Sequence, residues 1–281
     1  MPKIHLILSR LFFLVAAVMA LGCTHQIVRV SDKAEIPMGE FVERMKGVRI
    51  VFAGEVHDKK SHHKLQLDMI RALNEAGVDL AIGVEMFPRE DQQDIDRWIW
   101  GSMEESDFIK VYKRQWRLPW SNYREIFLYA REHRLPVVAL NVSRKIIHQV
   151  FTGGVASLTG EQMEQLPPGL VCDVDPEYEA FIREAMEGHE MDDATFEKFC
   201  AAQVVWDAAM AKSAVDYLDK NPEKKMLVLA GNGHSWKRGI PQRVEKLSGY
   251  DYLVILPEVS DLNSFNITSK DADYIWTGWF Y

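Results

Sequence analysis

The stretch VRIVFAGEVHDKKSHH, residues 48–63, begins as a buried strand and ends in titratable side chains. Mostly branched, apolar residues run up to Gly54, and such a run bounded by a turn residue is typical of a strand inside a parallel sheet. Helical spacing follows directly, through Leu65, Met69 and Leu73. A strand that passes into a covering helix is the repeating unit of α/β folds.

Apolar runs alternate with helical patterns along most of the chain. We expect strands at 47–54, 78–87, 135–141, 224–231 and 250–258. Polar residues and prolines interrupt this alternation over about 153–194, which predicts an inserted helical cap. The sequence therefore predicts an α/β fold, with a mostly parallel sheet flanked by helices, in a single domain over 47–281.

The first residues have the pattern of a bacterial lipoprotein signal peptide. Lys3 and Arg10 surround the start of an apolar run that is too short to cross a bilayer and that ends at Cys23. We expect residues 1–22 to be cleaved and Cys23 to be acylated, with 23–46 as a membrane tether and a short helix. The alternative is an ordinary signal peptide with an incidental cysteine. The expected location is the bacterial cell envelope, at the outer membrane, facing the periplasm or the surface.

The composition excludes some partners. Acidic residues number 41 and basic residues 33, for a net charge of -8, whereas proteins that bind nucleic acid usually carry an excess of basic residues. P-loop, GxGxxG, GxSxG, CxxC and CxxCH motifs are absent, so nucleotide binding and covalent c-type haem have no support. After Cys23, the thiols of Cys172 and Cys200 remain, and whether they pair is left open.

Two predicted strands end in the same way. IVFAGEVH (50–57) and MLVLAGNGH (226–234) both reach Ala-Gly, and His57 and His234 each follow that glycine by three residues. Ligands bind outside the carboxyl ends of parallel strands, so both imidazoles are expected in a ligand site. Glu55 projects on the same side as His57 if the chain stays extended.

A further carboxylate, Glu85, lies near the end of the next strand and needs a partner if it is buried. Together, Glu55, His57, Glu85 and His234 form a candidate ligand set for a divalent metal, or an acid–base cluster. The alternative is structural: the carboxylates cap helices and the imidazoles bind backbone carbonyls.

Other polar residues are weaker candidates. Gln203 and Asp207 lie four apart on one face of a long apolar helix, where they either point into the same crevice or orient the helix on the sheet. Tyr178 and His189 lie on the expected cap, where they would cover a ligand, although such residues are more often at the surface.

His62 and His63 begin the first covering helix. We expect both mainly at the solvent surface, with a position facing the site as the alternative for His62.

An ordered set of motifs behind the lipoprotein signal resembles the ChaN-like haem-binding lipoproteins, a family related to Tiki-type metalloproteases and erythromycin-esterase-like hydrolases. The motifs are GEVHD (54–58), GVEMF (83–87), VVALN (137–141), QVVWDAAMA (203–211) and LAGNGH (229–234). The resemblance implies an α/β core with a helical cap, a role in haem or iron uptake, and haem held at a dimer interface through a Tyr ligand. No motif marks that Tyr, and Tyr178 is the candidate from its place on the cap.

Two functions follow from the resemblance. The favoured one is a lipid-anchored protein that binds haem, in a cleft at the sheet edge or between two copies, and serves an uptake receptor or transporter. Its candidate haem contacts are His57, His234, Gln203, Asp207, Tyr178 and His189. The alternative is a metal-dependent hydrolase or peptidase of the Tiki type, in which Gly54 and His57 match the family's GxxH motif. A flat apolar slot favours haem, whereas convergence of Glu55, His57, Glu85 and His234 favours hydrolysis.

Overall fold

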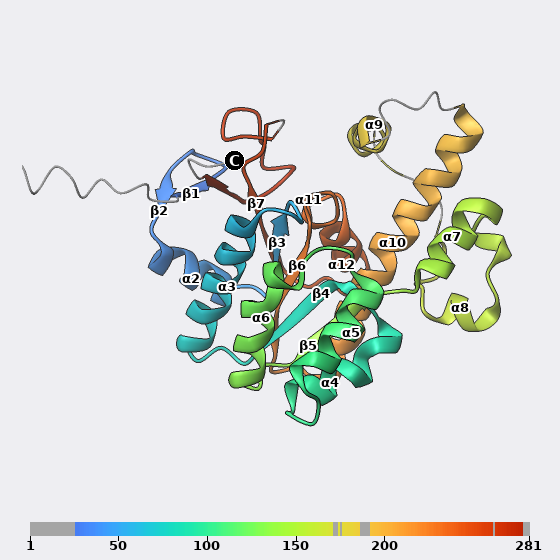
Figure 1. Ribbon diagram of the computed structural model, residues 1–281. Helices are drawn as coiled ribbons and strands as arrows, with labels where there is room; N and C mark the ends of the chain where they lie inside the picture. The colour runs from blue at the N-terminus through green and yellow to red at the C-terminus, as the bar shows by residue number, and fades with distance from the viewer. Residues whose placement is uncertain (1–25, 171–173, 175, 186–191, 261, 278–281) are drawn as a thin grey trace, which may run out of the picture.

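The computed structural model describes residues 26–170, 174, 176–185, 192–260 and 262–277. In this part of the chain an eight-stranded mixed sheet lies between two layers of helices (Figure 1), with the strand order β2-β1-β8-β7-β3-β6-β4-β5. The five expected strands are all present: β3 (Ile50–Glu55), β4 (Leu80–Pro88), β5 (Val137–Asn141), β6 (Lys225–Gly231) and β7 (Tyr252–Pro257). They pair in parallel, so their carboxyl ends meet at one edge.

Strand β3 lies at the centre, between β6 and β7, and all six of its residues are buried. Such complete burial explains its continuous apolar sequence, because helices cover both faces of the sheet. In the register of β3 with β6, Glu55 lies opposite Gly231 at the end of both strands. The end of β3 is therefore also the floor of the edge where the titratable residues gather.

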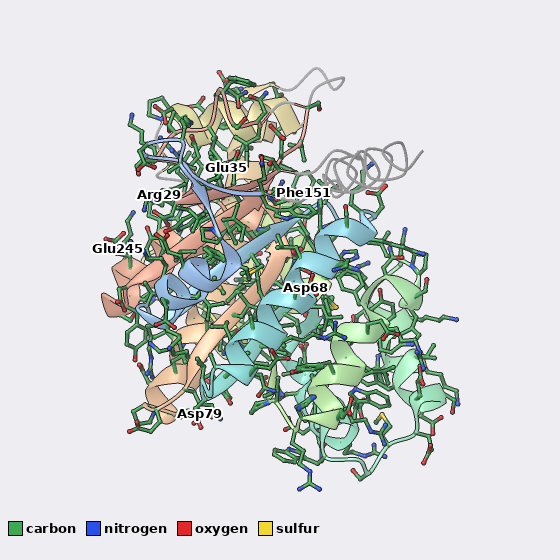
Figure 2. All side chains as sticks on the ribbon, turned by 90° about the vertical axis from the view of Figure 1, so that its left-hand side faces the viewer. Arg29, Glu35, Asp68, Asp79, Phe151 and Glu245 are labelled. Atoms are coloured by element: carbon green, nitrogen blue, oxygen red, sulfur yellow. The ribbon has the colours of Figure 1, made fainter. Side chains whose placement is uncertain are left out.

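One face of the sheet is covered by helices from the first half of the chain: α2 (Met38–Lys46), α3 (Lys60–Glu75), α4 (Gln92–Ile99), α5 (Glu105–Gln115) and α6 (Trp120–Glu132). The short helix η1 (Arg89–Asp91) leads into α4. The other face is covered by α10 (Asp193–Lys220) and α12 (Ile240–Ser248). Charged side chains lie on the outer side of these layers, as the ion pair of Lys64 with Asp68 on α3 illustrates (Figure 2).

The expected cap corresponds to small helices that pack on the first half of α10 (Figure 1). They are α7 (Arg144–Gly153), η2 (Val155–Ser157), α8 (Gly160–Glu164) and α9 (Pro176–Ala185). Ile146 and Val150 of α7 share a buried apolar cluster with Val205 of α10, and Tyr178 of α9 shares another with Val204. The helical layer thus begins at α7, earlier than the expected boundary near 153.

The edge beyond β7 differs from the expectation. Where we expected a tether, β1 (Gln26–Arg29) and β2 (Glu35–Ile36) form antiparallel strands before α2. They join the sheet through β8 (Tyr274–Thr277), which runs antiparallel to β1 and parallel to β7. Burial of Ile27 and Val28 accounts for this docking. Among the described residues, no helix has the length and apolar character to span a membrane.

Candidate functional site

The carboxyl ends of β3, β4 and β6 bring together the residues that sequence motifs singled out. Gly231, at the end of β6, allows this close approach: a Cβ there would lie 2.9 Å from His57 Cε1 and 3.1 Å from its Nε2. The same Cβ would lie 3.7 Å from Glu85 Oε2. His234 follows in the short helix α11 (Asn232–Ser235). The absence of a side chain at Gly231 therefore leaves room for an imidazole beside a carboxylate.

Glu55 holds His57 by its Nδ1 atom, 2.7 Å from Glu55 Oε1. Tyr123 donates its hydroxyl to the same oxygen, and Gln66 Nε2 donates to Oε2 at 2.8 Å. His63 Nε2 lies 3.6 Å from that second oxygen. Burial by itself would raise the pKa of Glu55, but the contacts with His57 and His63 outweigh it and lower this pKa below the ordinary value. Glu55 is therefore an anchored carboxylate that orients His57.

The His57 side chain remains 37% exposed. Burial lowers its pKa, yet the hydrogen bond that it donates to Glu55 and the charges of Glu85 and Glu55 overcome this effect, so the net shift is upward. With Nδ1 held by Glu55, Nε2 is the ring nitrogen that faces Gly231 and the site.

Asp207 of α10 holds His234 in the same manner. The Nδ1 atom of His234 lies 2.6 Å from Asp207 Oδ1, and Tyr178 of α9 donates its hydroxyl to the other carboxylate oxygen. The side-chain amide of Gln203 lies 3.3 Å from His234 Nδ1. Burial lowers the pKa of His234, but the charges of Glu85 and Asp207 raise it to about 9. This imidazole therefore carries a proton at neutral pH.

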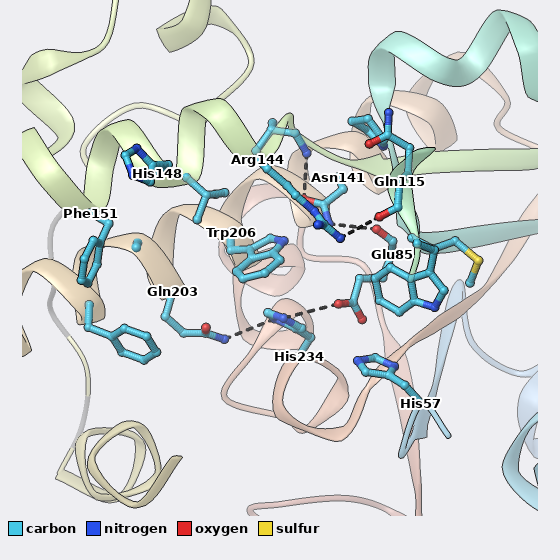
Figure 3. A pocket seen from close by; sticks show the side chains of 17 residues that line it. His57, Glu85, Gln115, Asn141, Arg144, His148, Phe151, Gln203, Trp206 and His234 are labelled. Atoms are coloured by element: carbon cyan, nitrogen blue, oxygen red, sulfur yellow. Dashed lines mark hydrogen bonds and ion pairs between the residues drawn. The ribbon is translucent and has the colours of Figure 1, made fainter. Parts of the chain in front are cut away.

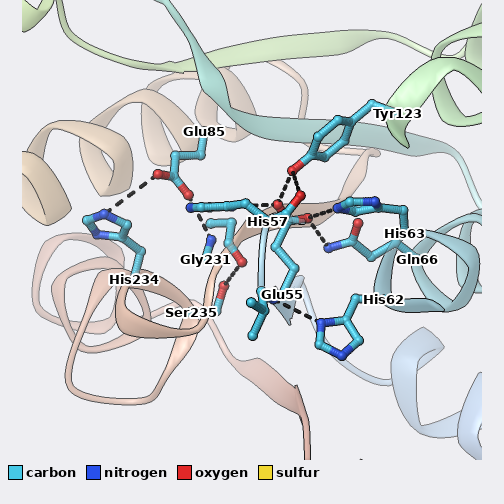
Figure 4. Close-up of polar contacts among 12 residues, drawn as sticks. Glu55, His57, His62, His63, Gln66, Glu85, Tyr123, Gly231, His234 and Ser235 are labelled. Atoms are coloured by element: carbon cyan, nitrogen blue, oxygen red, sulfur yellow. Dashed lines mark hydrogen bonds and ion pairs between the residues drawn. The ribbon is translucent and has the colours of Figure 1, made fainter. Parts of the chain in front are cut away.

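Two Tyr–carboxylate–His series thus flank Glu85. Figure 4 shows the first of them, Tyr123–Glu55–His57, together with the imidazole of His234 on the other side of Glu85. The Nε2 atom of His234 lies 3.7 Å from Glu85 Oε1. The backbone N–H of Gly231 donates to Glu85 Oε2 at 2.7 Å, and Asn141 donates to the Glu85 backbone carbonyl at 2.8 Å. The carboxylate of Glu85 is therefore fixed between two oriented imidazoles, an arrangement suited to binding or to proton transfer.

A cavity of about 620 Å³ opens above this cluster, and His57, Glu85 and His234 line its floor (Figure 3). Its walls are largely apolar and aromatic, and include Trp116, Ile147, Phe151, Phe199 and Trp206. The cavity lies between the sheet edge and the helices α7 and α10. An apolar chamber above a small group of oriented polar residues is typical of a small-molecule site.

The expected metal set is not shown. Within the described ranges, no group of three or more His, Cys, Asp or Glu side chains is arranged to hold a metal ion. The geometry gives the reason: both oxygens of Glu55 already accept hydrogen bonds, and Oε2 of Glu85 accepts the Gly231 N–H.

The cap residues have different positions from those expected of haem contacts. Tyr178 is buried, binds Asp207 behind His234 and does not line the cavity. Gln203 lines the cavity, whereas Asp207 supports it from behind. His189 and Cys23 lie outside the described residues. Cys200 is disulfide-bonded. Cys172 lies outside the described residues.

The expectation of solvated His62 and His63 is wrong, since both are buried. His62 Nδ1 accepts the backbone N–H of Val56 at 2.9 Å, which fixes the loop after β3, and His63 lies beside Glu55. Their helix, α3, turns this face toward the sheet edge.

Several site residues were not singled out in the sequence. Tyr123 lies in α6 and Trp116 in the connection between α5 and α6, and Arg144 and His148 of α7 line the cavity from the cap side. The spacing of Arg144 and His148, four residues apart on a helix, was the one available signal that they share a face.

Comparisons with known proteins agree with this geometry. A family model described as "Haem-binding uptake, Tiki superfamily, ChaN" matches residues 41–244. The structure is similar to ChaN of Campylobacter jejuni, described as binding haem cofacially, with a TM-score of 0.73 and 18% identity, over 90% of this chain and 96% of that chain.

Two other solved structures share the fold more distantly. A mutant erythromycin esterase in its open conformation has a TM-score of 0.50 and 14% identity, over 91% of this chain and 83% of that one. The type III effector HopBA1 has a TM-score of 0.51 and 17% identity, over 92% and 99%. No curated protein sequence matches this chain. At these identities the structural likenesses show the fold alone.

Proposed function

Because the chain belongs to the family of haem-binding uptake proteins of the Tiki superfamily, the ChaN proteins, we propose that it binds haem in the cavity above the sheet edge. One observation carries this proposal: His57 projects into an aromatic cavity while Glu55 holds its other ring nitrogen. Imidazoles that bind metals usually donate their second N–H to a carboxylate or carbonyl, which fixes the ring and increases its basicity.

The shape and lining of the cavity support haem as the ligand. Aromatic side chains such as Trp116 and Trp206 offer flat apolar surfaces to a porphyrin, and His57 at the floor would hold its iron, with the protonated His234 beside it as a hydrogen-bond donor. In the described residues no Tyr lines this cavity, so we propose His ligation in place of the Tyr ligand that the resemblance implied.

We further propose that the protein works in the bacterial cell envelope, anchored by lipid on Cys23. The N-terminal pattern of two basic residues, a short apolar run and Cys23 supports this location. A second copy of the chain and a haem-uptake receptor or transporter are the proposed partners. A carrier anchored in this way would hand its cargo to a transporter in the same envelope.

A haem titration of the full chain in detergent, with micelles alone as reference, tests the proposal. We expect a saturable Soret band with the wild-type protein. His57→Gln removes the side chain that would hold the haem iron, and it should weaken binding by about tenfold or more and shift the band. His133→Gln is the matched control, because it changes an exposed imidazole at the C-terminal end of α6. This variant should bind haem as the wild type does. A titration with no saturable band would refute haem binding.

A second candidate, hydrolysis, is favoured by the two oriented imidazoles around Glu85. His234, with a pKa of about 9, would donate a proton or stabilise an oxyanion, and Glu85 would accept a proton from water. A metal-dependent reaction of the Tiki type is the variant in which a divalent ion activates the water.

Assays with ester and peptide substrates, run with and without added divalent metals, test this second candidate. Hydrolysis that is lost in Glu85→Gln and kept in His133→Gln would support it. Equal rates in wild type and Glu85→Gln would refute it, and metal analysis of the active sample would separate the two variants of the reaction.

A further inference from the structure

The loop between β7 and β8 presents an aromatic side chain to solvent. Phe265 is 94% exposed, the largest exposed fraction of any large apolar side chain in the described part of the protein. Hydrogen bonds hold its turn in one conformation: the backbone N–H of Phe265 donates to Asn263 Oδ1 at 2.9 Å, and that of Asn263 donates to Asn266 Oδ1 at 2.7 Å. The exposure of Phe265 is therefore built into the fold of the loop.

The tip of this loop carries no charged side chain. Residues 262–268 have the sequence LNSFNIT, in a chain in which 26% of the residues are charged. Lys33, exposed on the hairpin between β1 and β2, donates to the backbone carbonyl of Ile267 at 3.1 Å and places an ammonium group at the foot of the tip. An aromatic tip without charges and with a lysine beside it suits the headgroup region of an anionic bilayer, because charged groups are costly inside lipid whereas cations at its surface are attracted.

The loop is joined to the end of β8 by two hydrogen bonds. The side chain of Glu258 accepts the backbone N–H of Ser264 at 3.1 Å. The backbone N–H of Glu258 donates in turn to the carbonyl of Trp276, in β8, at 2.8 Å. The position of the tip is therefore set by the edge of the sheet that β8 and β1 form.

The same edge receives the start of the described chain. Thr277, the last residue of β8, pairs with Gln26, the first residue of β1, and Figure 1 shows the loop after β7 next to β1. Cys23 lies three residues before Gln26 in the sequence, and a chain of that length spans at most about 11 Å. A lipid on Cys23 would thus hold the bilayer surface close to this edge and to Phe265.

We propose that residues 262–268, with Phe265 at the tip, form a membrane-docking surface that enters the headgroup region of a lipid bilayer. The proposal rests on the lipid anchor proposed above for Cys23, and it specifies which face of the anchored protein meets the membrane. Two contacts bind a membrane more firmly than one acyl anchor does, and the second contact also fixes the orientation. Lys270, in the same loop, pairs with Glu177 of α9 at 3.3 Å, so the cap helix α9 lies beside this surface.

The test measures the contact of two labelled positions with lipid. The full chain is purified in detergent and reconstituted into vesicles of phosphatidylethanolamine and phosphatidylglycerol that contain nitroxide-labelled lipid. Phe265→Cys carries a fluorescent label at the tip. Trp100→Cys is the matched control, because Trp100 is 60% exposed at the end of α4, which lies at the bottom of Figure 1, away from β1. We expect the label at position 265 to lose most of its emission and the label at position 100 to keep it, with the wild type treated in the same way as the background.

Flotation of the same vesicles separates the docking surface from the anchor on which it rests. Wild type should float with the vesicles, and Cys23→Ser should not. If the wild type floats but neither label is quenched, or both are quenched equally, the docking surface is overturned and the anchor stands. If the wild type does not float, or if Cys23→Ser floats equally well, anchoring through Cys23 is overturned, and the proposed surface with it.

Discussion

At the scale of single residues, Gly231 determines how closely the imidazole of His57 approaches Glu85. Its φ of -56° is accessible to any residue, so the constraint is space and not backbone strain. A methyl group there would meet the ring of His57, which is the mobile end of a side chain that is partly exposed. The glycine is thus required by the site more than by the fold.

We expect Gly231→Ala to push the His57 ring aside and to weaken haem binding by about tenfold, the cost of a misplaced ligand. The free energy of unfolding should change by less than about 1 kcal/mol, because the ring can move toward the cavity. Haem titration and urea denaturation measure the two effects. In the control Gly39→Ala, in helix α2, a Cβ has no neighbour within 4 Å, so binding should not change.

A gain in haem affinity, or a large loss of stability with unchanged affinity, would contradict this role of Gly231. Gly54→Ala provides the opposite case, because its Cβ would lie 2.6 Å from buried Leu256 and 2.4 Å from Asn232 Oδ1. That substitution should destabilise the fold.

The floor of the site could be predicted from the sequence because its residues follow strand ends. Glu55, His57 and His234 come directly after apolar runs, and the carboxyl ends of parallel strands converge. The walls could not be predicted in this way. Trp116 lies in the connection between α5 and α6, and its position depends on how these helices pack on the sheet.

At the scale of elements, α9 is tied to the site through Tyr178. Its hydroxyl donates to Asp207, a residue of α10 with no exposed surface that also holds His234. Hydrogen bonds to charged groups contribute more to stability than neutral ones do. Helix α9 and the imidazole of His234 are therefore coupled through Asp207.

We expect Tyr178→Phe to remove about 1–3 kcal/mol of this coupling, since it leaves one oxygen of a buried carboxylate without its donor. Amide hydrogen exchange over 176–185 should become faster, and the pKa of His234, followed by NMR, should change. Tyr250→Phe is the control, because its hydroxyl binds Asp219 at an exposed position. If amide exchange over 176–185 and the titration of His234 are the same in Tyr178→Phe as in the wild type, the hydrogen bond from Tyr178 to Asp207 has no energetic role.

The elements that could be predicted are those with strong local patterns. All five central strands have continuous apolar runs, and α3 shows helical spacing and full burial of Leu65, Met69 and Leu73. Strands β1, β2 and β8 could not be predicted as readily. They are two to four residues long, and β1 and β8 pair with each other from opposite ends of the chain, which no local pattern reveals.

At the scale of the whole molecule, buried imidazoles make stability depend on pH in two directions. His234 has its pKa raised to about 9, so the stabilisation it provides is complete below pH 6.5 and is lost as pH rises through 9. Burial, with the charge of His63 adding to it, lowers the pKa of His62 to about 4. Its contribution is complete above pH 6.5 and is lost as pH falls through 4.

We therefore expect the free energy of unfolding to be greatest near pH 6–7 and to fall on both sides, by up to about 3 kcal/mol for each imidazole. Urea denaturation between pH 4 and pH 9 measures this curve. His234→Gln should flatten the alkaline limb, and His62→Gln the acidic limb. Limbs of unchanged slope in these variants would show that other groups control the pH dependence.

The position of β1 between β2 and β8 has a consequence for the synthesis of the chain. Strand β1 is among the first described segments to leave the ribosome, yet its main partner, β8, ends at Thr277. The pairing of β1 with the two residues of β2 is too small to be stable alone. Strand β1 must therefore remain without its main partner until the chain has emerged as far as β8, and any premature stop before Tyr274 leaves this edge of the sheet open.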